Sequence, residues 1–116
     1  MIEMIEDYVR RAKYPTLTIE KVVEDIKNGL RVILDDGFLV LSVSQDELHV
    51  VHCYVKPGKA ELFKTFIDIT DKAARHFKCR VILFTTVRPK GMGAILGPYG
   101  YKPIPAVIFG REVDYE

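Results

Sequence analysis

Two histidines lie three residues apart in an apolar, β-rich run: His49 and His52 within Leu48–Val55. An imidazole titrates near neutral pH, so either side chain can take a proton from an amine. Side chains alternate along a strand, which predicts the two rings on opposite faces and at most one of them facing a cleft. The competing interpretation is one exposed histidine and one hydrogen-bonded core histidine. Both interpretations stay open on sequence alone.

Three further side chains could take part in chemistry: Cys53 and Tyr54 in this run, and Tyr99 later in the chain. Tyr99, in a Gly-Pro-Tyr-Gly turn, could act as an acid or could simply pack as an aromatic ring. Cys53 is predicted on the strand face opposite His52, which excludes a Cys/His nucleophile pair within this strand. Tyr54 is predicted on the same face as His52. The two cysteines make no disulfide framework, and no zinc-type spacing occurs.

The stretch after this run, Lys56–Lys59, precedes a long helical pattern. A helix start offers free backbone N–H groups and a partial positive charge, both suited to a phosphate. Gly58 would allow close backbone approach, while Lys56 and Lys59 would add positive charge. An ordinary Pro-Gly turn is the competing interpretation.

The elements that must position these residues follow from hydrophobic period and turn residues. A strand at Leu48–Val55, a helix at Ala60–Lys78 and a strand at Val81–Val87 form a βαβ unit, so the two strands should be parallel. The order is α-α-β-β-β-α-β-α-β, an α/β (α+β) mixed sheet in one domain, residues 1–116. The other predicted elements are helices at Ile2–Lys13, Ile19–Asn28 and Lys90–Leu96, strands at Arg31–Leu34 and Phe38–Val43, and a last strand at Tyr101–Val113 whose start is irregular because of Pro103 and Pro105.

This order resembles the GNAT superfamily of acyl-coenzyme A N-acyltransferases without its first strand. Residues Leu48–Tyr101 carry the resemblance: the strand ending in Val55-Lys56-Pro57, the Gly58-Lys59-Ala60 start of a long helix, and Gly100-Tyr101, where the family usually has Gly-Phe. The resemblance implies a GNAT-like sandwich with a central parallel strand pair that parts to admit coenzyme A.

The resemblance also implies roles for individual residues. The backbone of the first parallel strand would hold the pantetheine and the following loop the pyrophosphate, and His52 or His49 with Tyr99 would move protons. The acyl group, acetyl in many members, would pass from acetyl-coenzyme A or another acyl-coenzyme A to the amine of a small molecule or peptide. The residues implied in cofactor binding are Cys53, Tyr54, Val55, Lys56, Gly58, Lys59 and Ala60.

An alternative function comes from the departures from the family pattern. The loop is several residues short and lacks the leading Gln or Arg, Leu96 stands where a tyrosine acid is common, and Pro89 stands where an asparagine often begins the short helix. A catalytically inactive binding or assembly protein of the same fold, of the kind also found in viral genomes, would tolerate these departures.

Charge and composition limit the kinds of partner that the protein can have. Residues 1–50 carry a net charge of −4 and residues 51–116 a net charge of +5, which indicates either a solvated basic face or an anionic ligand held by the second half. The bases are scattered singly, which argues against nucleic acid. No apolar run approaches the ~20 residues of a membrane span, and two unpaired cysteines fit a cytoplasmic location. Exposed strand edges and the apolar stretch Ala106–Phe109 predict a homodimer.

Overall fold

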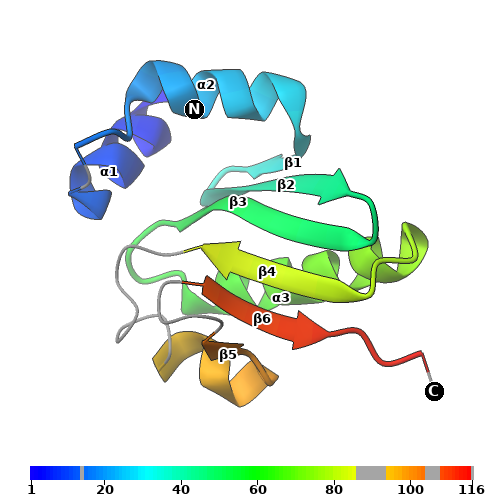
Figure 1. Ribbon diagram of the computed structural model, residues 1–116. Helices are drawn as coiled ribbons and strands as arrows, with labels where there is room; N and C mark the ends of the chain where they lie inside the picture. Colours follow the sequence, from blue (N-terminus) through cyan, green and yellow to red (C-terminus); the bar gives the residue numbers. More distant parts are fainter. Residues whose placement is uncertain (14, 86–93, 104–107, 116) are drawn as a thin grey trace.

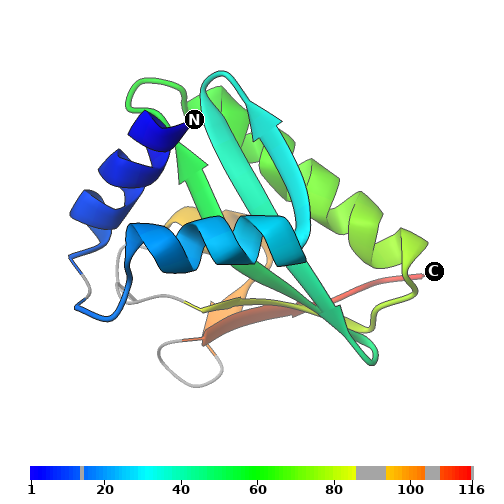
Figure 2. The ribbon, with the colours of Figure 1, turned by 90° about the horizontal axis from the view of Figure 1, so that it is seen from above.

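The computed structural model describes residues 1–13, 15–85, 94–103 and 108–115 (Figure 1). A six-stranded mixed sheet has the order β1-β2-β3-β4-β6-β5. Figure 2 looks onto the face of the sheet that α1 and α2 cover, with α3 behind it. The elements are α1 (Ile2–Ala12), α2 (Ile19–Asn28), β1 (Leu30–Leu34), β2 (Gly37–Ser44), β3 (Glu47–Val55), α3 (Ala60–His76), β4 (Val81–Thr85), the 3-10 turn η1 (Gly97–Tyr99), β5 (Lys102–Pro103) and β6 (Ile108–Glu112).

Local signals set most of these boundaries. The Thr18 hydroxyl accepts a hydrogen bond from the Lys21 N–H at 3.1 Å and so caps α2 as expected. The α1 helix ends where Lys13 takes a left-handed conformation, with φ at 52°. The α3 helix ends at His76, two residues earlier than predicted, and Lys78 is again left-handed. The mixed sheet and the parallel β3–β4 pair are confirmed.

Two cores lie on the two faces of the sheet. The larger one packs α3 against the sheet, and its fully buried side chains include Leu48, Phe66 and Ile82. The smaller one packs α1 and α2 against β2 and β3 around Val22 and Phe38. Burying a large apolar side chain contributes about 1.5–3 kcal/mol, so both cores fix their helices on the sheet.

The end of the chain departs from the prediction. In place of one irregular strand from Tyr101 to Val113, β5 and β6 pair antiparallel with each other, with Lys102 opposite Gly110. The two prolines deny a continuous ladder, and the chain reverses direction between the two short strands. The predicted helix at Lys90–Leu96 lies outside the described residues except for residues 94–96, which are helical. The predicted strand end at residues 86–87 and residues 106–107 of the apolar stretch Ala106–Phe109 also lie outside them.

A β-bulge in β3 changes which side chains share a face. Leu41 pairs with Val50 but Val40 pairs with His52, so Val51 has no paired residue in β2. The extra residue resets the alternation, and His49 therefore lies on the same face as His52, beneath α1 and α2. The prediction that the two histidines lie on opposite faces was wrong for this reason.

The parallel strands part at their carboxyl ends. Pairing between β3 and β4 runs from Glu47 opposite Val81 to Val50 opposite Phe84. Beyond that point β3 continues to Val55 with no β4 partner among the described residues, while β4 stays paired with β6 as far as Thr85. The separation begins at the bulge and can be followed in Figure 2, and beyond it this edge of β3 has no partner strand among the described residues.

Candidate functional site

His52 lies at the start of this separation and is buried between two helices. Its side chain is 6% exposed. Nε2 lies 2.8 Å from Oδ2 of Asp25 on α2, and Nδ1 lies 2.7 Å from the hydroxyl of Tyr8 on α1. An ionised carboxylate can only accept, so Nε2–H donates to Asp25 and Nδ1 accepts the Tyr8 O–H, an assignment made from this network.

The charges around His52 favour this arrangement. Burial acts to raise the pKa of Asp25, but hydrogen bonds from His52 and Lys21 outweigh it, so the pKa is lowered and the carboxylate stays ionised. The Lys21 ammonium lies 3.0 Å from the second Asp25 oxygen. Burial, with the negative charge of Asp25, raises the pKa of Tyr8, so its hydroxyl keeps its proton.

Sequence reasoning missed Tyr8 and Asp25. Tyr8 belongs to the apolar stripe of α1, where a buried hydroxyl needs a partner, and Asp25 adjoins buried Ile26 on α2. A second polar contact lies beside them, because the Tyr54 hydroxyl donates to Asp7 of α1 at 2.6 Å. Two consecutive α1 residues therefore bind polar side chains of β3.

The other candidate proton carriers lie in different surroundings. His49 is half-buried and precedes the separation of the strands. Tyr99 is half-buried in η1, packs against the α3-side core and contacts Phe63 edge-on, with ring centroids 6.3 Å apart. His52 and Tyr99 thus lie on opposite sides of the sheet. Leu96 is fully buried in the same α3-side core.

Cys53 occupies the sheet face opposite His52, as predicted. It packs against the α3-side core, and burial raises the pKa of its thiol to about 12. A thiol that stays protonated at neutral pH is a poor nucleophile. Its side chain is therefore structural, and any contact it makes with a cofactor would come from its backbone.

The loop before α3 has a conformation suited to an anion. Gly58 has φ at 83°, and a Cβ placed there would meet nothing within 4 Å. Among the described residues no side chain caps the start of α3, whose cap position is Lys59. The first N–H groups of a helix that lacks a capping side chain are available to an anion.

The lysines of this loop already have a carboxylate partner. Asp36 lies 3.9 Å from the Lys56 ammonium and 3.7 Å from the Lys59 ammonium. The carbonyl of Asp36 also accepts the Lys56 N–H at 2.8 Å. A ligand phosphate would therefore compete with Asp36 for both ammonium groups.

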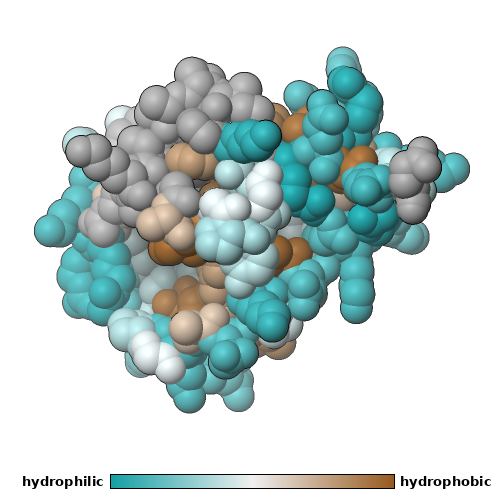
Figure 3. Space-filling view, turned by 90° about the horizontal axis from the view of Figure 1, so that it is seen from below, coloured by the Kyte–Doolittle hydropathy of each residue, from teal (hydrophilic) through white to brown (hydrophobic). Residues whose placement is uncertain are grey.

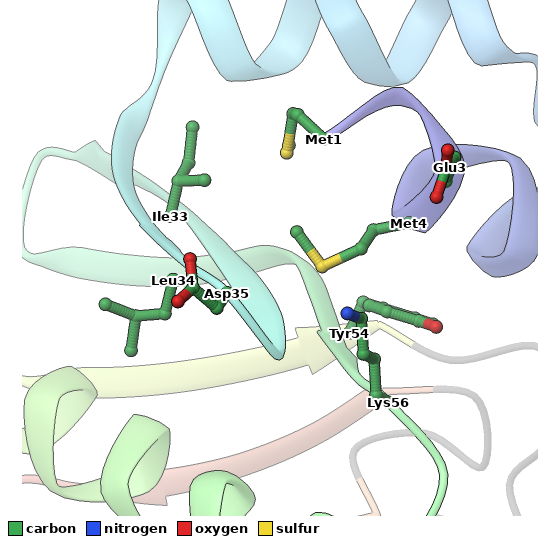
Figure 4. Close-up of a pocket in the computed structure, with 8 residues that line it drawn as sticks. All are labelled: Met1, Glu3, Met4, Ile33, Leu34, Asp35, Tyr54 and Lys56. Atoms are coloured by element: carbon green, nitrogen blue, oxygen red, sulfur yellow. The ribbon is translucent and has the colours of Figure 1, made fainter.

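Two hollows adjoin the carboxyl end of β3. One, of about 590 Å³, is bordered by the β1–β2 turn and by the start of α3, so that Asp35, Asp36 and Glu61 line it together with Gly58, Lys59 and Ala60. A diphosphate at the start of α3 would therefore lie near these carboxylates as well as near the helix N–H groups. The other, of about 370 Å³, lies between the start of α1 and the β1–β2 hairpin. In Figure 4 Met1 and Met4 face Ile33 across this second hollow. Both lie on the β1 side of β3, away from the opening toward β4.

No family model and no curated protein matches this sequence. Solved structures do match its backbone. Tetrahymena GCN5 superposes with a TM-score of 0.75 at 10% identity, over 99% of this chain and 87% of that one. The ribosomal-protein-S18-alanine N-acetyltransferase of Escherichia coli gives 0.73 at 10% identity, over 99% and 89%. Rv2747 from Mycobacterium tuberculosis, solved in complex with CoA, gives 0.64 at 13% identity, over 90% and 68%.

The chain has the GNAT acetyltransferase fold. In this GNAT fold the separating pair is β3 and β4, and α3 follows the strand that carries His52.

Among the described residues no helix is long and apolar enough to cross a membrane, and no cluster of His, Cys, Asp or Glu could hold a metal ion. Apolar residues reach the surface in patches between hydrophilic ones (Figure 3). A homodimer stays a prediction.

Proposed function

We propose that this protein is an acyl-coenzyme A-dependent N-acyltransferase that transfers an acyl group to an amine. The observation that carries the proposal is the separation of β3 from β4 after Val50 and Phe84, next to a helix start at Lys59 where no described side chain acts as a cap. An open strand edge and a helix N-terminus in sequence suit an extended, amide-bearing chain that ends in a diphosphate.

The described residues fit such a cofactor in two places. The backbone of Cys53, Tyr54 and Val55 would pair with the pantetheine amides, because that strand edge has no described partner beyond Val50. The N–H groups around Gly58–Ala60 would hold the pyrophosphate, with Lys56 and Lys59 released from Asp36 to neutralise it. The bound thioester would supply an activated acyl carbonyl.

Proton transfer would use side chains from both sides of the sheet. His52 would be the final acceptor of the proton that the acceptor ammonium must lose before its nitrogen can attack. Tyr99 Oη, on the α3 side, would return a proton to the departing thiolate. His49 shares the face of His52 but lies before the strands part, so His52 is the better placed base.

Thermal unfolding with and without coenzyme A tests the proposal. A ligand that binds only the native state raises Tm, and at 100 times Kd the gain is about 2.7 kcal/mol. The rise should shrink in Lys59→Glu. The matched control is Lys64→Glu, the same charge change at an exposed position of α3, which should keep the full rise. No shift of Tm at millimolar coenzyme A or acetyl-coenzyme A would overturn the proposal.

A catalytically inactive binding protein of the same fold is the second candidate. The pairing of Asp36 with both loop lysines favours it, because these charges are already neutralised without a ligand. This candidate would be favoured if coenzyme A changed the Tm of neither the wild-type protein nor the Asp36→Asn variant.

A further inference from the structure

A continuous chain of hydrogen bonds crosses the molecule from α1 to α2. The Tyr8 hydroxyl donates to His52 Nδ1, and His52 Nε2–H donates to Asp25, whose other oxygen pairs with Lys21. Three elements contribute to it: α1, β3 and α2. The chain lies where β3 begins to leave β4, on the face opposite α3.

We propose that Tyr8 is the substrate-facing end of a proton relay in which His52 and Asp25 are positioning residues. The inference rests on the proposed acyl transfer. Tyr8 Oη takes a proton from the acceptor ammonium as its own proton passes to His52 Nδ1. The amine nitrogen gains the lone pair that attacks the acyl carbonyl, and the positive charge moves to the imidazolium. No oxidant, reductant or further reactant is needed.

Burial makes His52 unable to meet the amine by itself. It is 6% exposed, and both ring nitrogens are already occupied. Tyr8 is only half-buried, and its ring contacts those of Phe38 and His52 edge-on, with centroids 5.4 and 5.3 Å away. A proton therefore reaches the imidazole through the Tyr8 hydroxyl.

The groups facing His52 support a transient positive charge. From α1 comes the neutral Tyr8 hydroxyl, and from α2 comes the Asp25 carboxylate, itself shared with Lys21. From β2 comes the apolar Val40, directly opposite in the sheet, and on β3 the neighbouring Tyr54 is engaged with Asp7. Asp25, the one carboxylate among the described residues that contacts the ring, stabilises the imidazolium while the proton is held there.

Tyr8→Phe tests the relay because it removes one oxygen and keeps the ring. We expect kcat for acetyl transfer to fall about 100-fold or more, in the range typical of general base catalysis, with KM for the amine little changed. Asp25→Asn should lower kcat and move the acidic limb of the pH profile of kcat/KM to lower pH. An amide stabilises the imidazolium less than a carboxylate does.

Asp7→Asn is the matched control. It weakens the neighbouring contact between α1 and β3 without touching the chain of hydrogen bonds. If the role of Tyr8 is purely structural, both Tyr8→Phe and Asp7→Asn should lower stability, and neither should change kcat. An unchanged kcat in Tyr8→Phe, in a wild-type protein that transfers acetyl groups, would overturn the relay alone.

A measurement that does not depend on activity tests the relay independently of the proposed function. Nitrogen-15 NMR of the His52 ring should find the proton on Nε2 and an accepting Nδ1, with the Nδ1 signal moving in Tyr8→Phe. A proton on Nδ1 would overturn the relay whatever the activity. A wild-type protein with the expected tautomer and no acetyl transfer would instead overturn the proposed function, and the relay with it.

Discussion

The two faces of the sheet bury different chemistry. Against α3 the core is mainly apolar, with Phe66 at 1% exposure, although it also includes buried Tyr101. Against α1 and α2 the core includes a histidine, two tyrosine hydroxyls and the carboxylate that His52 contacts. A buried polar group costs stability unless it is hydrogen-bonded, and here the partners come from separate elements. The α3 face contributes most of the apolar core and contains Tyr99, whereas the α1–α2 face contains the hydrogen-bonded groups that would take the proton from the amine.

The largest expected effect lies on the α3 face. Phe66→Ala should lower the free energy of unfolding by about 3–5 kcal/mol, because a fully buried aromatic ring leaves a cavity. Tyr8→Phe on the other face should cost only about 1 kcal/mol, the usual value of one hydrogen bond. Urea denaturation measures both. Equal losses would contradict the division between a structural face and a chemical face.

Acid should weaken the α1–α2 face. A hydrogen bond from Tyr54 and the guanidinium groups of Arg11 and Arg10 lower the pKa of Asp7 to about 2, and the pKa of Asp25 is also lowered. Both carboxylates therefore add stability above their unfolded pKa, near 4, and lose it as the pH falls through their folded values. Tm should decline between about pH 4 and pH 2, less steeply in Asp7→Asn. A parallel decline in that variant would count against this assignment.

The smallest expected effect lies at the loop. Asp36→Asn removes the carboxylate near Lys56 and Lys59, so coenzyme A should bind about two- to threefold more tightly at low salt. Calorimetric titration measures the change, which should shrink as salt screens exposed charges. Weaker binding in this variant would indicate that Asp36 supports the loop more than it competes with the ligand.

Local patterns predicted most of the fold and only part of the site. The turn at Asp35-Asp36-Gly37, the Thr18 cap and the helical stripes are short-range signals, and the structure has them all. The bulge at Val51 is not a short-range signal, because it arises from the register between β2 and β3 in a run of β-branched residues. Sequence alternation therefore put the two histidines on opposite faces, where the structure has them on one.

The partners of His52 were hidden for a related reason. Tyr8 and Asp25 are 44 and 27 residues away from it along the chain, and each looks ordinary on its own helix. Only the packing of α1 and α2 on β3 brings them together. Likewise the prolines near the end indicated an interrupted strand, but the pairing of β5 with β6 depends on tertiary structure.

Backbone amide NMR during titration with coenzyme A tests the central claim most directly. The account predicts the largest shift changes at Val51–Val55 and Gly58–Ala60, where β3 has left β4 and α3 begins. Shift changes confined to α1 and the β1–β2 hairpin, or none at millimolar coenzyme A, would contradict it.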